Sequence, residues 1–165
     1  MLHEVNIAGL TLDQATNTPI LILKSVDDHH SIPIWIGLLE ATAIASVLQE
    51  INFDRPMTHD LFKNFIRLMK AEIIKIEVSD LKENTFYAKI HFMSGDRNFD
   101  MDARPSDAIA LALRFKAPIF IDDKVIEKFG TGDIKHEAVD ESEEGKKWAE
   151  YLEKLNPDDF GKYKV

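Results

Sequence analysis

The feature that most constrains the fold of this chain is an internal duplication. The segment Glu40-Ala41-Thr42-Ala43-Ile44-Ala45 matches Asp107-Ala108-Ile109-Ala110-Leu111-Ala112 at a spacing of 67 positions, since each has an acid followed by alanines at alternate positions. Three strand-like runs precede each segment, so the order of elements repeats as well. One such unit cannot bury a face of its own sheet. We therefore expect the two copies to pack together around a shared core.

Hydrophobic periodicity divides the chain into elements that fit this duplication. The first copy is predicted to contain strands at 5–12, 20–26 and 31–36 and helices at 38–51 and 58–70. The second copy is predicted to contain strands at 72–79, 85–93 and 97–103, a helix at 105–115 and a last strand at 118–121. Pro33 favours an edge or a bulge for its strand. The predicted fold is α+β, with a mixed β-sheet core, two β-β-β-α repeats and packed helices.

Beyond residue 130 the composition changes. Residues 131–165 hold ten acidic residues against six lysines, and Trp148, Tyr151, Leu152 and Leu155 form a narrow apolar stripe at helical spacing. We divide the chain into a body, 1–130, and an acidic C-terminal helical tail, 131–165. The tail helix is predicted to dock on its own body or on a neighbouring subunit, which favours a homo-oligomer.

Composition excludes several classes of protein. The chain has 165 residues and no cysteine, and its longest apolar runs fall short of the roughly 18–20 residues that span a bilayer. The first residues lack the basic region of a signal peptide, so we predict a cytoplasmic protein without a membrane partner. A surface rich in Glu and Lys, with only two glutamines, indicates a heat-adapted source. The formal charge of -9 argues against a surface that is basic throughout, as general nucleic-acid binders have.

Four motifs, taken together and in order, resemble one family. They are Pro33-Ile34-Trp35-Ile36-Gly37 with Glu40-Ala41, Arg55-Pro56-Met57-Thr58-His59-Asp60-Leu61, Thr85-Phe86-Tyr87-Ala88, and Asp102-Ala103-Arg104-Pro105-Ser106-Asp107-Ala108-Ile109-Ala110-Leu111-Ala112. The chain resembles the bifunctional nuclease (BFN) domain family over about residues 1–130, as a bacterial member. The resemblance implies a mixed-sheet α+β domain and, by analogy with plant members, hydrolysis of DNA and RNA with little sequence preference. A short helical repair-protein-like motif that follows the body in some relatives has no match here.

Phosphodiester hydrolysis needs an activated water and stabilisation of the charge at phosphorus. Glu40 lies on the apolar face of its predicted helix and needs a partner there, unless it is simply a first-turn acid; Asp107 occupies the matching position of the second copy. His59 and Asp60 diverge by about 100° on their helix, so each needs its own partner. Arg104 is a candidate phosphate clamp, or else an ion-pair partner of Glu40 or Asp107. These five residues are the candidate catalytic set.

Two further groups carry candidate binding roles. Asp100, Asp102 and the downstream Asp107 are candidate ligands of a divalent cation such as magnesium or manganese, although alternating acids also mark the solvent side of a strand. Asp27-Asp28-His29-His30 is a weaker metal candidate because it occupies a predicted turn. Arg55 is a candidate nucleic-acid-binding residue. A basic stripe on the helix predicted at 58–70 is either a second binding surface or a solvent-exposed helix face, and it consists of Lys63, Arg67 and Lys70.

The residues leave two function classes open. The first is a nuclease of low sequence specificity, in which the five-residue set forms the site. The second is a non-catalytic binding or regulatory module, in which the same polar cluster stabilises the junction between repeats or a subunit interface. A nucleotide-dependent enzyme is the weakest class, because the chain has no Walker-type or Rossmann glycine loop.

Overall fold

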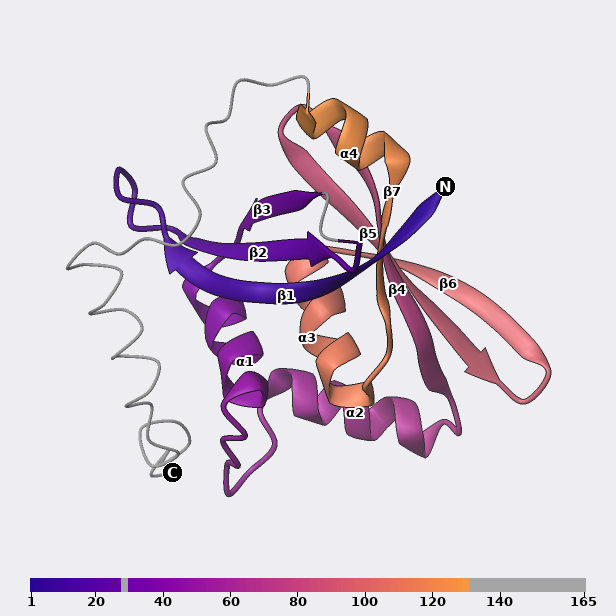
Figure 1. The fold of residues 1–165 in the computed structure, drawn as a ribbon. Helices are drawn as coiled ribbons and strands as arrows, with labels where there is room; N and C mark the ends of the chain where they lie inside the picture. Colours follow the sequence, from indigo (N-terminus) through magenta and orange to yellow (C-terminus); the bar gives the residue numbers. More distant parts are fainter. Residues whose placement is uncertain (28–29, 131–165) are drawn as a thin grey trace.

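The computed structural model describes residues 1–27 and 30–130. They form one seven-stranded sheet in the order β3-β2-β1-β7-β4-β5-β6 (Figure 1). The strands are β1 (Leu2–Leu12), β2 (Pro19–Ser25), β3 (Ser31–Trp35), β4 (Glu72–Lys82), β5 (Thr85–Ser94), β6 (Arg97–Ala103) and β7 (Ile119–Asp122). The described helices are α1 (Leu38–Leu48), α2 (Thr58–Leu68), α3 (Pro105–Phe115) and α4 (Asp123–Gly130). The predicted tail helix, its subunit contact, and Asp28 and His29 of the predicted turn lie outside the described residues.

The duplication is visible in the order of the elements. Three strands followed by α1 make the first copy, and three strands followed by α3 make the second. Both bounds of α3 lie 67 positions after those of α1. β7 joins the copies, since it pairs antiparallel with β1 and parallel with β4. The sheet is therefore mixed and the fold is α+β with two β-β-β-α repeats, as predicted.

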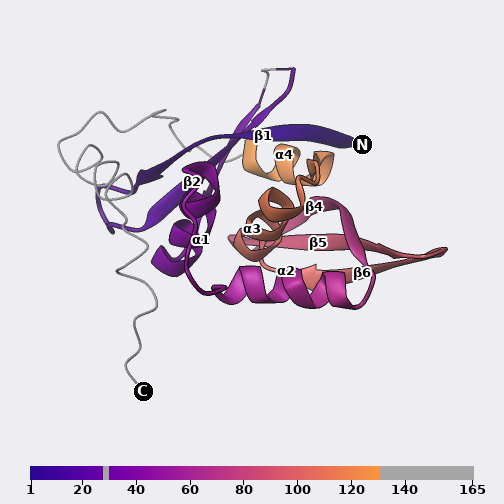
Figure 2. The same cartoon turned by 90° about the horizontal axis from the view of Figure 1, so that it is seen from below.

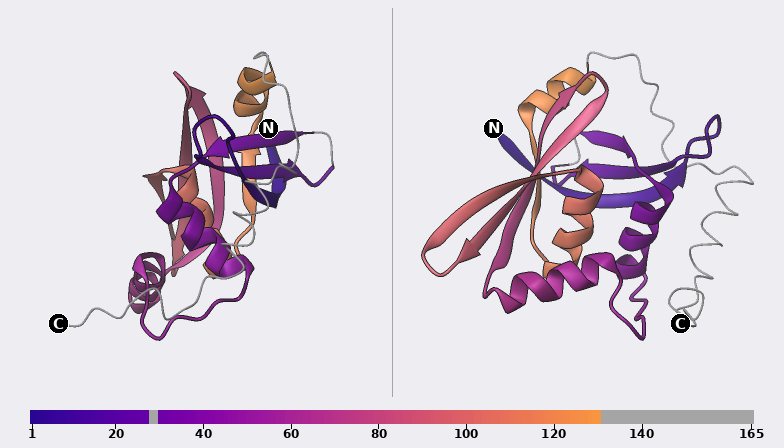
Figure 3. Two further views of the ribbon diagram at one scale, coloured as in Figure 1. Left: turned by 90° about the vertical axis from the view of Figure 1, so that its left-hand side faces the viewer. Right: turned by 180° about the vertical axis from the view of Figure 1, so that it is seen from behind.

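Burial explains why the strands form where the sequence predicts them. In β2, Leu21 and Leu23 are fully buried while Ile20 and Ile22 are half-buried, so the continuous apolar run covers one core face and one partly covered face. β3 lies at the edge of the sheet, which is where Pro33 is tolerated because it lacks a backbone N–H. In Figures 1 and 3 the strands of the two copies cross at a steep angle. This strong twist leaves room for α3 between the two halves of the sheet.

The two repeat helices pack against each other, and each carries buried alanines. α1 contacts α3, and the alanines of the duplicated segment are fully or almost fully buried at corresponding positions, namely Ala41, Ala45, Ala108 and Ala112. Small side chains allow two helix backbones to approach closely, and the buried Ile44 and Ile109 fill the core beside them. The alternate alanines of the sequence therefore mark the helix–helix contact that positions both helix N-termini.

α2 has no counterpart at the same place in the second copy, and it runs along the lower edge of the body in Figure 1 and Figure 2. Its inner face consists of the buried Ile66 and the half-buried Phe62. Phe65 and Met69 lie at helical spacing with these two residues, opposite Lys63 and Arg67, but both side chains are exposed. The reason is that α2 contacts mainly α3, so only a narrow stripe of the helix is covered.

Among the described residues, no helix combines the length and apolar character needed to cross a membrane.

The alanine contact gives a direct stability prediction. Ala108→Leu adds volume between α1 and α3, and overpacking of a close-packed core costs about 1–3 kcal/mol or more. The free energy of unfolding, measured by urea denaturation, is expected to fall by that amount. Ala15→Leu, at an exposed turn position, is the control and is expected to unfold like wild type. Equal stability of the Ala108 variant and wild type would show that α1 and α3 are not tightly packed.

Candidate active site

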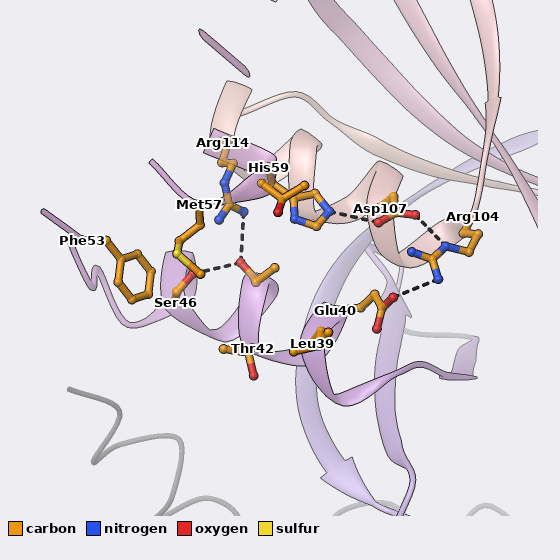
Figure 4. Close-up of a pocket in the computed structure, with 12 residues that line it drawn as sticks. Leu39, Glu40, Thr42, Ser46, Phe53, Met57, His59, Arg104, Asp107 and Arg114 are labelled. Atoms are coloured by element: carbon orange, nitrogen blue, oxygen red, sulfur yellow. Dashed lines mark hydrogen bonds and ion pairs between the residues drawn. The ribbon is translucent and has the colours of Figure 1, made fainter. Parts of the chain in front are cut away.

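The N-termini of α1, α2 and α3 meet at one open pocket with a volume of about 390 Å³. Glu40 lies in the first turn of α1, His59 in the first turn of α2 and Asp107 in the first turn of α3, while Arg104 is the residue that caps α3. The pocket is lined by Leu39, Glu40, Thr42, Ala43, Ser46, Phe53, Met57, Thr58, His59, Arg104, Asp107 and Arg114 (Figure 4). Four of the five predicted catalytic residues therefore share one cavity.

Arg104 joins the matching acids of the two repeats. Its Nη1 lies 2.9 Å from Glu40 Oε1, and its Nε donates a hydrogen bond to Asp107 Oδ2 at 2.7 Å. The hydrogen bond to Asp107 and, to a smaller extent, the charge of Glu40 raise the pKa of Arg104. The guanidinium is nevertheless open to solvent, since its side chain is 65% exposed. It is therefore held at the pocket without being sealed off from a ligand.

Gly37 occupies the position in the first repeat that Arg104 occupies in the second. It caps α1 as Arg104 caps α3, and its backbone is extended, with φ -75° and ψ 160°, which any residue can adopt. A Cβ at this position would overlap Oε2 of Glu40, so a larger residue would force the Glu40 side chain to move. The Glu40 carboxylate thus lies directly against the backbone at Gly37, and the matching positions before the two helices supply a single arginine, Arg104, for the two acids.

His59 and Asp107 form the second contact of the site. His59 Nε2 lies 3.0 Å from Asp107 Oδ1, and both side chains are half-buried. Burial alone would raise the pKa of Asp107, but the hydrogen bonds and charges of Arg104 and His59 outweigh it and lower that pKa below 3.8. An ionised carboxylate only accepts hydrogen bonds, so Nε2–H of His59 is the donor, and Nδ1 is the ring nitrogen that can take up or release a proton.

Asp60 is the predicted catalytic residue that does not line the pocket. Its Oδ2 accepts a hydrogen bond from the N–H of Met57 at the start of α2, and its Oδ1 accepts one from Arg114 Nε at 2.6 Å. The divergence of His59 and Asp60 on their helix sends one toward Asp107 and the other toward Arg114. Asp60 therefore occupies a capping and bracing position.

Arg114 is a pocket residue that the sequence reasoning missed. Its side chain is only 4% exposed, and Nη1 donates to the carbonyl oxygens of Ala43 in α1 and Ala110 in α3. Together with Asp60 it ties α1, α2 and α3 at one point, which fixes His59 relative to Asp107. The sequence gives one signal for this role: Arg114 lies within the alanine- and leucine-rich run of α3, and a charge buried there requires a partner.

The predicted binding residues lie outside the pocket. Arg55 is exposed in the segment between α1 and α2, and Lys70 is exposed just after α2. Arg67 lies over the Phe115 ring, with its guanidinium carbon 5.7 Å from the ring centroid. Partial burial, followed by the charges of Arg67, Arg114 and Lys116, lowers the pKa of Lys63. Lys63 and Arg67 of the basic stripe therefore lie near the basic residues at the C-terminal end of α3.

Asp100, Asp102 and Asp107, the predicted candidate cation ligands, do not come together as a group in the described residues. Asp100 and Asp102 lie on β6, where Asp100 Oδ1 is 2.7 Å from His91 Nδ1, whereas Asp107 turns toward His59 and Arg104 after the chain enters α3. In the part of the chain that the structure describes, no three His, Asp or Glu side chains form a group that could hold a metal ion. The change of direction at Pro105 separates acids that are neighbours in sequence.

The lowered pKa of Asp107 has a measurable consequence. A carboxyl with a depressed pKa stabilises the fold above its unfolded pKa, here 3.8, and this stabilisation is lost as the pH falls through the lower folded value. Arg104→Gln removes the nearby charge, so the pKa of Asp107 is expected to rise and acid destabilisation to begin at higher pH. A ¹³C NMR titration of the carboxyl groups measures the shift. An unchanged Asp107 pKa would contradict the described pairing.

The position of Asp60 predicts a loss of stability. Asp60→Ala removes a helix cap and leaves the buried Arg114 guanidinium without its acid, so the free energy of unfolding is expected to fall by about 2–4 kcal/mol. Asp54→Ala, in the exposed segment before α2, is the matched control and is expected to change little. Urea unfolding of both variants distinguishes the bracing position from an ordinary surface acid.

Comparison with known proteins agrees with the sequence resemblance. A protein of Mycobacterium tuberculosis strain H37Rv, described as uncharacterized, is 36% identical over 162 residues, which is 95% of this chain and 97% of the relative. Bifunctional nuclease 1 of Oryza sativa subsp. indica is 22% identical over 133 residues, 71% of this chain and 40% of the rice protein. Bifunctional nuclease 2 of Arabidopsis thaliana is 25% identical over 91 residues, 53% of this chain and 28% of that protein.

The family model described as the bifunctional nuclease domain matches residues 21–133, well over half of the chain. This range contains all the motifs that predicted the resemblance and every residue of the pocket. The chain therefore belongs to the bifunctional nuclease domain family.

Proposed function

We propose that this protein hydrolyses phosphodiester bonds of DNA and RNA with low sequence specificity, at the pocket between α1, α2 and α3. The observation that carries the proposal is the constellation of a His59–Asp107 pair and a solvent-open arginine at one cavity. A general base oriented by an acid can activate a water molecule, and a neighbouring cation can stabilise the negative charge that develops when that water attacks phosphorus. Family membership supports the same reaction class.

His59 is the proposed general base. The carboxylate of Asp107 accepts a hydrogen bond from Nε2–H, which leaves Nδ1 as the nitrogen that can take a proton and stabilises the ring when it becomes positively charged. Nδ1 takes a proton from a water molecule as the water oxygen forms a bond to phosphorus. The bond from phosphorus to the leaving oxygen then breaks, and that oxygen takes a proton from solvent.

Arg104 is the proposed phosphate clamp. A guanidinium has five N–H donors in a planar fork, and the contacts with Glu40 and Asp107 are made through Nη1 and Nε. The exposed remainder of the group is available to a phosphate oxygen and would offset the charge that develops during attack. Glu40 acts through Arg104 by fixing its orientation.

The charge balance at the pocket determines the assay conditions. Arg104 is shared by Glu40 and Asp107, and Arg114 is paired with Asp60, so a phosphate approaching the site meets an excess of one negative charge. The basic residues predicted to bind nucleic acid lie outside the pocket and would offset this charge along a bound strand, namely Arg55, Lys63, Arg67 and Lys70. An added divalent cation such as magnesium or manganese would do the same. The reaction is therefore tested with each cation and with a chelator.

One observation favours a second function, a non-catalytic binding or regulatory module. Arg104 contacts both matching acids, so the polar cluster also works as a link between repeats. In that case the polar residues would be needed for stability or partner binding and not for cutting. The two functions differ in whether a folded His59 variant retains all the activity of the preparation.

The assay follows cutting of single-stranded DNA and RNA by wild type, His59→Ala and Arg104→Ala. Loss of a general base is expected to lower the rate by about 10²–10⁴-fold, with a large loss for Arg104→Ala as well. His91→Ala is the matched control, because His91 also contacts acids, Glu77 and Asp100, but lies away from the pocket. Its rate is expected to equal that of wild type.

The outcome that contradicts the nuclease proposal is specific. If folded His59→Ala and Arg104→Ala proteins cut as fast as wild type, or if activity disappears on further purification, the cutting does not come from this pocket. The non-catalytic function would then be the better account of the polar cluster.

A further inference from the structure

The proposed chemistry uses only one end of the pocket. In Figure 4, Glu40, Arg104 and Asp107 lie at one end, while Phe53 and Met57 lie at the other. Leu39 and Ala43 add aliphatic surface to the lining. A phosphate group alone has no use for an apolar wall, because it is small, charged and recognised by hydrogen-bond donors.

The apolar lining includes an unusually exposed side chain. Leu39 is 79% exposed although it belongs to the first turn of α1, next to Glu40. Single exposed leucines are ordinary on a convex surface, but this one borders a concave space that also contains an aromatic ring. The volume of about 390 Å³ falls in the range of roughly 300–1,000 Å³ typical of small-molecule sites. The cavity therefore has room for more than a phosphate.

We propose that the apolar end is a nucleobase subsite, in which the base next to the scissile phosphate lies against Phe53 and Met57. This inference rests on the proposed function, since it assigns the phosphate of the same substrate to Arg104. A nucleotide has a flat apolar face joined to an anionic group, and the pocket has an apolar end joined to a cationic one. A peptide or a plain phosphate would match only one of the two ends.

The lining also explains why such a subsite would accept any base. Three hydroxyls line the pocket, and two of them are directed into α1, since Thr42 Oγ1 donates to the Leu38 carbonyl and Ser46 Oγ donates to the Ala43 carbonyl; the third belongs to Thr58, beside His59. Every base has a π face that can stack on an aromatic ring, whereas base identity is read by hydrogen bonds to its edges. Stacking without edge contacts gives affinity with little sequence preference.

Binding of two single-stranded hexamers tests the subsite. One is a hexathymidylate and the other carries abasic tetrahydrofuran units in place of every nucleoside; both have phosphorothioate linkages, so they keep their charge and resist cutting. Fluorescence anisotropy is expected to show binding of the base-containing strand tighter by about 5- to 150-fold, the loss associated with one stacked base. Phe53→Ala is expected to weaken the base-containing strand to the level of the abasic strand and to leave the abasic strand unchanged.

Leu68→Ala is the matched control, because Leu68 is an exposed apolar residue at the far end of α2. It is expected to retain the base preference of wild type. Should Phe53→Ala fail to fold, Met57→Ala replaces it, and the comparison of the two strands on wild type needs no variant. Equal binding of both strands by wild type, binding of neither, or a preference that survives both substitutions would overturn the subsite.

Cutting of unmodified strands by wild type is measured in parallel, which separates the two proposals. Cutting with equal affinity for base-containing and abasic strands would overturn the subsite and leave the nuclease function standing. Base-dependent binding with no cutting would support the subsite and overturn the nuclease function.

Discussion

The packing of α1 against α3 brings two carboxylates of like charge, Glu40 and Asp107, to the same pocket, and the rest of the site depends on how that charge is balanced. Both come from the matching position of a duplicated unit, so the symmetry of the fold itself creates the repulsion. Arg104 compensates both acids at once. Because its side chain is largely exposed, such contacts are worth little free energy, and their main effect is to hold a cation in a fixed place. The buried Arg114, in contrast, is positioned to stabilise the fold.

The duplication becomes a site only where the copies differ. At the position before each helix, Gly37 leaves space for the Glu40 carboxylate, whereas Arg104 extends a guanidinium between the acids. After the first helix, the chain adds α2, whose N-terminus contributes His59. A symmetric pair of repeats would have had two acids and no base. The differences at these positions give the pocket three kinds of chemical group.

Much of this fold could be predicted from the sequence because its signals are local. Alternation of apolar residues placed the strands, the alanine pattern marked the packed helices, and Pro33 indicated the edge. The convergence of Glu40, His59, Arg104 and Asp107 at one cavity agreed with the motifs, although their chemical roles are still proposals. Contacts between distant segments could not be predicted from the sequence. Asp60 pairs with Arg114, 54 positions away. The chain enters α3 at Pro105, so Asp107 lies on a different element from Asp100 and Asp102. Such contacts depend on the packing of whole elements, which no spacing encodes.

The central claim is that Arg104, though paired with two acids, still binds a phosphate beside His59. It is tested most directly by NMR titration of the full chain with a dinucleoside phosphorothioate, following the Arg104 side-chain N–H and the His59 ring signals. The account predicts saturable shifts at these two residues and at the pocket lining, with none at His91. Shifts confined to other surfaces, or no shift at Arg104 and His59 at saturating ligand, would contradict it.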